Sequence, residues 1–199
     1  IATSKPYGLA VSGKYLYIAD QWNSKVYIVD ISNPAAPARL GTYTGGVAPS
    51  ALYASGKYLY VGDDGGGFYT LNVSNPNATP AVVGSYNTSG SYYGVQIAGN
   101  YAYLSDHSGT TTVLDIHAST TPALVGHLLI GGTPWGLTVS GKYAYVADNT
   151  SGLKVIDLNG ADLPLASIGA IESNSINVSD DLTVGNNIYA GGGLDVGIS

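Results

Sequence analysis

The sequence predicts an all-β fold made of four copies of one small antiparallel sheet. Three observations lead to this prediction. A nine-residue segment that begins at Ser12 recurs three times at nearly constant spacing. Charged residues make up only 10% of the 199 residues, less than half the usual share. Glycine and tyrosine are abundant, at 28 and 17 residues, while helix-forming residues are scarce, so strands and tight turns are favoured.

The recurring segment sets the period of the chain. Its first copy reads Ser-Gly-Lys-Tyr-Leu-Tyr-Ile-Ala-Asp, and the glycines that anchor the four copies are 43, 43 and 42 positions apart. These glycines are Gly13, Gly56, Gly99 and Gly141. A period near 42 residues that contains four short strands is typical of a β-propeller, in which sheets called blades stack face to face around an axis. The predicted blades cover residues 6–48, 49–90, 91–132 and 133–170.

Each blade is predicted to contain four strands in chain order. The first is a short apolar run, such as 8–11 or 136–139, that ends at a Gly turn with positive φ. The second alternates aromatic and aliphatic residues with the period of two of a pleated strand, and it ends at an aspartate. The third strands are predicted at 26–30, 68–72, 112–115 and 153–157. The fourth strands begin at a proline, which an outer edge tolerates, and are predicted at 37–43, 80–86, 122–128 and 164–170.

The third strand carries a signature. Residues 26–34 read Val-Tyr-Ile-Val-Asp-Ile-Ser-Asn-Pro, followed by Pro37 and Leu40-Gly41. This pattern resembles the LVIVD repeat of bacterial and archaeal surface and secreted β-propellers. The likeness covers residues 6 to about 170, with departures at 116–119 and 158–160. It implies a propeller at an extracellular or cell-surface location, and it assigns no reaction.

Four blades are at the lower end of the range of about four to eight found in closed propellers. Three arrangements therefore stay open: a compact four-bladed ring, half of a ring completed by a second chain, and a fragment of a longer propeller. Residues 1–5 supply no strand to the last blade, which favours an incomplete ring or one completed by another chain. The start at Ile1 is interpreted as that of a processed or excised product.

The period changes beyond residue 170. Residues 176–199 form four six-residue units, each beginning with Ile or Leu and carrying Val or Ala two positions later. Short strands separated by corners are typical of β-helices and interwound fibre stems, and one chain has too few of them to bury its apolar row. Residues 171–199 are therefore predicted to form a β-helix-like tail that pairs with copies of itself, in a trimer or filament, or with its own propeller. The predicted assembly residues are Ile176, Val178, Leu182, Val184, Ile188, Leu194 and Val196.

Composition argues against several classes of function. With 7 Lys and Arg against 13 Asp and Glu, the net charge of −6 argues against nucleic acid as a partner. The chain has no cysteine and no apolar run long enough for a membrane helix, so membrane insertion is not expected. No nucleophile elbow, phosphate-binding loop or zincin motif is present, and the sole glutamate, Glu172, lies in the linker to the tail. The chain is therefore not expected to be an enzyme.

Aromatic residues begin three of the predicted blades. They are Tyr7, Tyr92, Tyr93 and Trp135, which come just before a glycine in the sequence. They are expected near one axial end of the propeller. Exposed Tyr and Trp rings in such a place suit the C–H faces of sugars. The alternative is that these rings pack between blades. They are the candidate ligand-binding residues, with a glycan or a surface protein as the expected ligand.

The aspartates that close the second strands recur in every blade. They are Asp20, Asp63, Asp106 and Asp148. A ring of carboxylates could bind Ca²⁺ or sugar hydroxyls, but repetition in all four blades favours a structural role in accepting turn N–H bonds. Asp63 and Asp64, followed by three glycines, are the one locally enriched acidic site, without EF-hand spacing. His107, His117 and His127 are not expected to converge on a metal, and no cofactor is expected.

Together these observations predict an extracellular structural or adhesive protein, a subunit of a cell-surface fibre or filament assembled through the tail. The alternative is a lectin-like or protein-binding propeller module. Strand donation between successive subunits is a further route to a filament.

Overall fold

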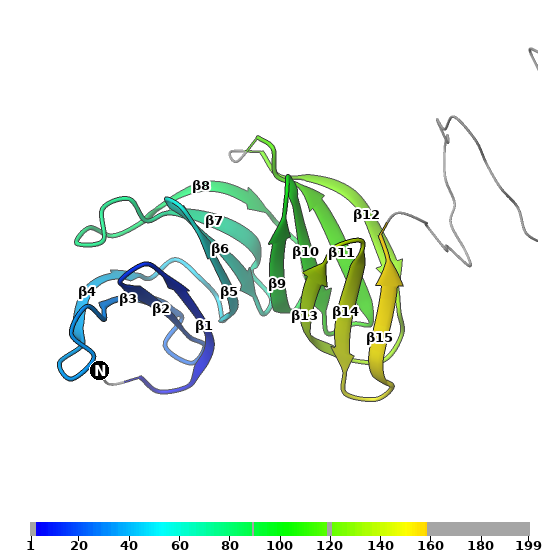
Figure 1. Cartoon of the computed structure of the whole chain (residues 1–199), viewed down its shortest axis with the longest axis horizontal. Coiled ribbons are helices and arrows are strands. Elements are labelled where there is room, and N and C mark those ends of the chain that lie inside the picture. The colour runs from blue at the N-terminus through cyan, green and yellow to red at the C-terminus, as the bar shows by residue number, and fades with distance from the viewer. Residues whose placement is uncertain (1–2, 89, 119–120, 159–199) are drawn as a thin grey trace, which may run out of the picture. The chain divides into compact units, whose positions relative to one another are not determined.

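The structure is a computed structural model that describes residues 3–88, 90–118 and 121–158. All of these residues belong to the first of the two units into which the chain divides, Ile1–Leu163. Within the described residues, fifteen strands form four antiparallel sheets, which follow one another along an arc in Figure 1. The prediction of an all-β propeller is confirmed. The predicted tail at 171–199, its assembly residues and the fourth strand of blade 4 lie outside the described residues.

The strands follow the predicted order within each blade. Blade 1 contains β1 (Pro6–Ser12), β2 (Tyr15–Asp20), β3 (Lys25–Asp30) and β4 (Ala38–Tyr43). Blade 2 contains β5 (Pro49–Ser55), β6 (Tyr58–Asp63), β7 (Gly67–Asn72) and β8 (Ala81–Tyr86). Blade 3 contains β9 (Tyr92–Ala98), β10 (Tyr101–Asp106), β11 (Thr110–Asp115) and β12 (Ala123–Leu129). The described part of blade 4 contains β13 (Pro134–Ser140), β14 (Tyr143–Asp148) and β15 (Gly152–Asp157). In every sheet the strands are hydrogen-bonded in chain order.

The turn between the first two strands is the same in all four blades. The glycine at this turn has φ of 57°, 56°, 58° and 58° in blades 1 to 4, a left-handed conformation that side chains with a Cβ adopt at a cost. The first strands begin two residues earlier than predicted, at Pro6 in blade 1 and at Pro134 in blade 4. These prolines each lie opposite the aspartate that ends the second strand.

Each blade has two faces, which we name by the chain direction: the leading face points to the preceding blade and the trailing face to the next one. The trailing face of blade 1 packs against the leading face of blade 2 in one hydrophobic cluster, which includes Ile28 from the first and Leu71 from the second. A second cluster joins blades 2 and 3 around Phe68 and Leu104. Because each blade buries its faces against its neighbours, the stability of the propeller lies largely between blades.

The first strand of each blade is the innermost one. β1, β5, β9 and β13 pack against one another in turn, and in Figure 1 they lie side by side along the inside of the arc. β1 and β13, the first and last of the four, do not pack together in the way that successive inner strands do. The described blades therefore leave a gap between blade 4 and blade 1. The described residues include no helix that is long and apolar enough to cross a membrane.

Candidate functional site

Three of the four predicted ligand-binding aromatics meet at one axial end of the inner strands. Tyr7, Tyr93 and Trp135 occupy the second position of β1, β9 and β13, which is the same position in three different blades. The ring centroids of Tyr7 and Tyr93 are 5.5 Å apart, and those of Tyr93 and Trp135 are 5.1 Å apart. Tyr7 and Trp135 are stacked, with centroids 6.0 Å apart and an interplanar angle of 16°. The two tyrosines are half-buried and Trp135 is 39% exposed, so solvent reaches the cluster.

The equivalent position in blade 2 is a serine. The Ser50 hydroxyl is buried and lies 2.5 Å from the carbonyl oxygen of Tyr92 and 3.1 Å from that of Gly62. Ser50 therefore ties blade 2 to blade 3, and blade 2 contributes no ring to the cluster.

Tyr92 does not join these rings. Its side chain is only 1% exposed and belongs to the hydrophobic cluster between blades 2 and 3, with its hydroxyl 3.1 Å from that of Thr88. Successive side chains of a strand point to opposite sides, so Tyr92 packs into the interior when Tyr93 faces the axis. The expectation of Tyr92 as a ligand-binding residue is therefore corrected: it is a packing residue.

A row of polar side chains adjoins the aromatic rings. It consists of the residue that follows each strand-end aspartate, which is Gln21, Asp64, His107 and Asn149 in blades 1 to 4. The Tyr93 hydroxyl donates a hydrogen bond to Asp64 Oδ2 at 2.6 Å, and the Gln21 amide donates to the same oxygen at 3.3 Å. The His107 ring lies 5.1 Å from Tyr93 and 5.4 Å from Trp135. We call Tyr7, Tyr93, Trp135, His107, Asp64 and Gln21 the axial cluster.

Gln21 and His107 were not predicted as members of a ligand site. A signal for them exists in the repeat: the strand-end aspartate is the same in all four blades, whereas the next residue differs in each blade and is always capable of hydrogen bonding. The constant aspartate bonds the backbone of its own blade or linker, and the variable residue after it gives each blade a different polar group near the axis.

Burial and the neighbouring carboxylate raise the pKa values of the two axial tyrosines. Burial, followed by the hydrogen bond to Asp64 and the charge of that carboxylate, raises the pKa of Tyr93 to about 12. Burial and then the charge of Asp64 also raise the pKa of Tyr7. The Lys5 ammonium lies 5.3 Å from the Tyr7 ring centroid and donates to the Gln21 amide oxygen at 2.6 Å. The cluster thus presents uncharged aromatic rings and hydroxyls, with Asp64 bonded to Tyr93 and Lys5 beside Tyr7.

A hollow adjoins the axial cluster on the trailing side of blade 4. Its volume is about 390 Å³, and it is lined by Trp135, Ala147, Asp148, Asn149, Gly152 and Leu153. The Trp135 indole belongs to both the cluster and the hollow, so a ligand bound there would contact this ring. A hollow of mainly apolar lining with a few polar groups is typical of small-molecule sites.

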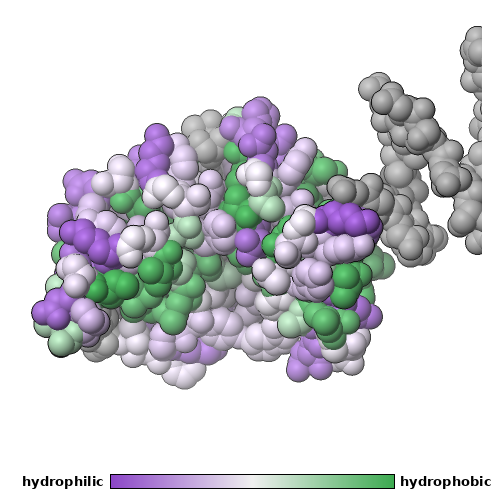
Figure 2. All heavy atoms as spheres, viewed as in Figure 1, coloured by the Kyte–Doolittle hydropathy of each residue, from purple (hydrophilic) through white to green (hydrophobic). Residues whose placement is uncertain are grey.

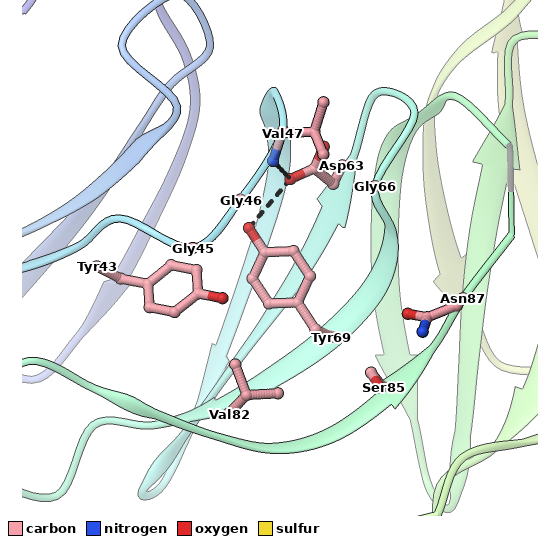
Figure 3. Close-up of a pocket in the computed structure, with 10 residues that line it drawn as sticks. All are labelled: Tyr43, Gly45, Gly46, Val47, Asp63, Gly66, Tyr69, Val82, Ser85 and Asn87. Carbon is pink, nitrogen blue, oxygen red and sulfur yellow. Dashed lines mark hydrogen bonds between the residues drawn. The ribbon is translucent and has the colours of Figure 1, made fainter.

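A second pocket, of about 200 Å³, lies beside Asp63 (Figure 3). It is bounded by the Gly45-Gly46 linker, by Tyr43 and Tyr69, and by β8. The Asp63 carboxylate accepts hydrogen bonds from the backbone N–H groups of Val47 and Ala48, at 3.0 and 2.7 Å, and from the Tyr69 hydroxyl at 3.2 Å. Because Asp63 is occupied by these donors, we assign this pocket a structural role.

The structure separates the two acidic residues that were considered for Ca²⁺. Asp63 holds the linker between blades, while Asp64 bonds Tyr93 and Gln21 in the axial cluster. Among the described residues, no group of three or more His, Asp or Glu side chains is arranged to hold a metal ion. His117 pairs with Asp115 at 2.9 Å and His127 with Thr112 at 3.0 Å, both away from His107.

The four strand-end aspartates accept backbone N–H bonds. Asp20 bonds the N–H groups of Ser4 and Lys5, at 2.8 and 3.1 Å, and so anchors the segment before β1. Asp63 does the same before β5, while Asp106 and Asp148 bond the N–H groups of the turns that follow them. All four carboxylates are buried and serve the framework, as the repetition in every blade indicated.

We expect acid to weaken the fold in part through Asp148. Burial acts to raise the pKa of Asp148, but hydrogen bonds from Thr150 and Ser151 outweigh it and lower the pKa from 3.8 to about 2. A carboxyl with a lowered folded-state pKa contributes stability above its unfolded value, and this is lost as the pH falls through about 2. Asp148→Asn should therefore flatten the loss of stability between about pH 4 and pH 2, measured as urea midpoints.

Asp63 provides the contrast for this measurement. Burial raises the pKa of Asp63, against the hydrogen bonds of Ala48, Val47 and Tyr69, so its contribution is present at low pH and is lost as the pH rises. Asp63→Asn should leave the acid slope as steep as in the wild type or steeper. If both variants reduced the acid loss of stability equally, the opposite pKa shifts of Asp148 and Asp63 would be contradicted.

Comparison with known proteins agrees with the four blades described above. The model of the LVIVD repeat matches four times, at residues 6–45, 47–88, 89–129 and 131–161. The chain belongs to the LVIVD-repeat family. These matches cover the larger part of the sequence, and their spacing follows the blades.

Solved structures share this fold at low sequence identity. The computationally designed Ika4 protein is 15% identical with a TM-score of 0.66, and the match covers 79% of this chain and 94% of Ika4. The computationally designed Ika8 protein is 15% identical with a TM-score of 0.63, and the match covers 78% of this chain and 46% of Ika8. No curated protein matches the chain at a significant level.

Proposed function

We propose that this LVIVD-repeat propeller is a binding module that takes a carbohydrate at the axial cluster. The observation that carries the proposal is the convergence of Tyr7, Tyr93 and Trp135 from three blades onto one solvent-accessible site. Rings that only sealed contacts between blades would be buried, as Tyr92 is, whereas Trp135 keeps 39% of its surface exposed.

The chemistry of the axial cluster suits a neutral ligand with hydroxyl groups. Aromatic faces stack on the C–H faces of a sugar ring, and the tryptophan provides the largest such surface. Asp64 and Gln21 offer a hydrogen-bond acceptor and a mixed donor and acceptor beside the rings, and His107 adds a third polar group. A module that binds in this way acts by recognition and carries out no catalytic step.

We expect the intact chain to bind glycans on an array and Trp135→Ala to weaken that binding by at least tenfold. Removal of an aromatic anchor from a binding site commonly costs about 2 kcal/mol or more, which is about a thirtyfold loss of affinity. Tyr7→Ala should weaken binding in the same direction. Since the chain has two tryptophans, a Trp22→Phe background leaves Trp135 as the one indole, and its fluorescence reports binding directly.

Tyr101→Ala is the matched control. Tyr101 is 42% exposed, close to the value for Trp135, and it lies at the start of β10 rather than in the axial cluster. Its loss should leave affinity unchanged. An array without any bound glycan, or equal binding by Trp135→Ala and the wild type, would count against the proposal.

The wider setting that we propose is adhesion at a cell surface or outside the cell. This part of the proposal draws on the LVIVD family and on the six-residue repeats at 171–199, through which the chain would join a fibre or filament. A propeller that recognises glycans would serve as the adhesive head of such an assembly.

A further inference from the structure

The two end blades of the described propeller each have exposed aliphatic side chains on the face that no other described blade covers. On the leading face of blade 1, Leu9 and Val11 are exposed, and on the trailing face of blade 4, Leu153 and Val155 are exposed. These four side chains are between 56% and 66% exposed, and each pair forms an apolar patch on one end of the described blades. In Figure 2 hydrophobic surface gathers over blade 1 and over blade 4.

The rows that contain these exposed side chains match rows that are buried between blades. Cross-strand pairing places Leu9, Ile18 and Tyr27 in one row of the leading face of blade 1. The equivalent row in blade 2 is Leu52, Val61 and Tyr69, which packs against blade 1 in a hydrophobic cluster. In blade 1, Ile18 and Tyr27 are already buried in a small cluster, and Leu9 is the member of this row that stays exposed. The chain therefore leaves exposed at Leu9 a position that it buries at Leu52 in its second blade.

The trailing face of blade 4 shows the same correspondence. Ala147 and Leu153 pair across β14 and β15, as Tyr145 and Val155 do. Their equivalents in blade 1 are buried in the cluster with blade 2, and these are Ala19, Val26, Tyr17 and Ile28. The trailing face of blade 4 thus resembles the trailing face of blade 1, and the leading face of blade 1 resembles the leading face of blade 2. A contact between blade 4 and blade 1 would therefore repeat the contact between blades 1 and 2.

Glycine at position 136 gives independent support. A Cβ at the equivalent Gly8 would lie 2.5 Å from the carbonyl oxygen of Ser50, and one at Gly94 would lie 3.0 Å from the backbone nitrogen of Leu137. Glycine is needed at both positions because the next inner strand passes so close. A Cβ at Gly136 would meet nothing within 4 Å. Blade 4 therefore has the glycine that would let a further inner strand pass close by, but no described strand lies there.

We propose that a second copy of this chain fills the gap, with blade 4 of each copy packed against blade 1 of the other. Two such contacts, related by a twofold axis, close a ring of eight blades. A second copy supplies both missing faces at once, in the side-chain pattern that the chain already uses between its own blades. The second copy would cover the hollow on the trailing side of blade 4, so this proposal leaves the axial cluster, and not that hollow, as the carbohydrate site.

The test is the mass of the full chain in solution, by light scattering, with Gly136→Val as the main variant. The wild type should have twice the mass of one chain, and Gly136→Val should have the mass of one chain, because its branched side chain occupies the space of the partner's β1. Since nothing lies within 4 Å of Gly136, this variant should keep the wild-type circular dichroism spectrum. Gly126→Val is the matched control, a strand glycine with equally open surroundings, and should keep the double mass.

Leu9→Asp tests the opposite face. It should also reduce the mass to that of one chain, while Leu129→Asp, at a leucine of β12 that is even more exposed, should not. A wild type with the mass of one chain would overturn the proposal, as would a mass above two chains that Gly136→Val does not reduce. A double mass that persists in Gly136→Val and Leu9→Asp would place assembly elsewhere, for instance at 171–199, and would also overturn it.

Discussion

Replacing Phe68 with alanine is expected to lower the free energy of unfolding by about 3 to 5 kcal/mol. Phe68 is the one phenylalanine of the chain, and it is fully buried in the cluster that joins blades 2 and 3. Its ring stacks on Tyr60, with centroids 6.2 Å apart and an interplanar angle of 14°. Truncation removes this contact and leaves a cavity on both sides of the boundary, because rigid strands cannot collapse into it.

Urea unfolding followed by circular dichroism measures this loss. Leu129→Ala is the control, since Leu129 is exposed and its truncation should change the stability by no more than about 0.5 kcal/mol. Because the cluster links neighbouring blades, Phe68→Ala should also make the transition less cooperative. A loss no larger than that of Leu129→Ala would show that the boundary between blades 2 and 3 contributes little to stability.

Gly8→Ala is expected to destabilise the propeller by about 1 to 3 kcal/mol. The added Cβ would lie 2.5 Å from the carbonyl oxygen of Ser50 and 3.1 Å from the Cα atom of Ala51. Both are backbone atoms of β5, so relief requires the inner strands of blades 1 and 2 to move apart. This differs from a clash with a flexible side chain, which a rotamer change would remove.

Gly126→Ala is the comparison for this measurement. Gly126 also lies in a strand, but a Cβ there meets nothing within 4 Å. Its replacement should leave the unfolding midpoint unchanged or raise it slightly, since alanine has less freedom in the unfolded chain. Equal effects at Gly8 and Gly126 would argue that strand propensity, and not the spacing of inner strands, decides both results.

The axial cluster was predictable only in part. The four aromatics were identifiable because they lie at the starts of three of the four blades, and three of them do converge. Tyr92 and Tyr93 are adjacent in the chain, so only one of them can face the axis. The register of β9 against β10 and the packing of blade 2 decide which one does, and the sequence does not show either.

The polar side of the cluster was less accessible to sequence reasoning. Gln21 and Asp64 are 43 positions apart, and they meet because equivalent corners of successive blades lie next to each other. Asp63 and Asp64 looked alike as a local acidic pair. In the structure, neighbouring donors engage Asp63 in the framework, while Asp64 bonds an axial tyrosine.

The sequence by itself determined the repeat, the strands, the glycine turns and the framework role of the strand-end aspartates. The repeat is visible as a segment that recurs every 42 or 43 residues. The other features depend on patterns within about twenty residues, where alternation, turn chemistry and short-range hydrogen bonds dominate. Only the tertiary structure decided which side chains meet at the axis and which blade faces stay uncovered. Both depend on how the blades stack, since contacts between residues more than forty positions apart follow from packing and not from local preference.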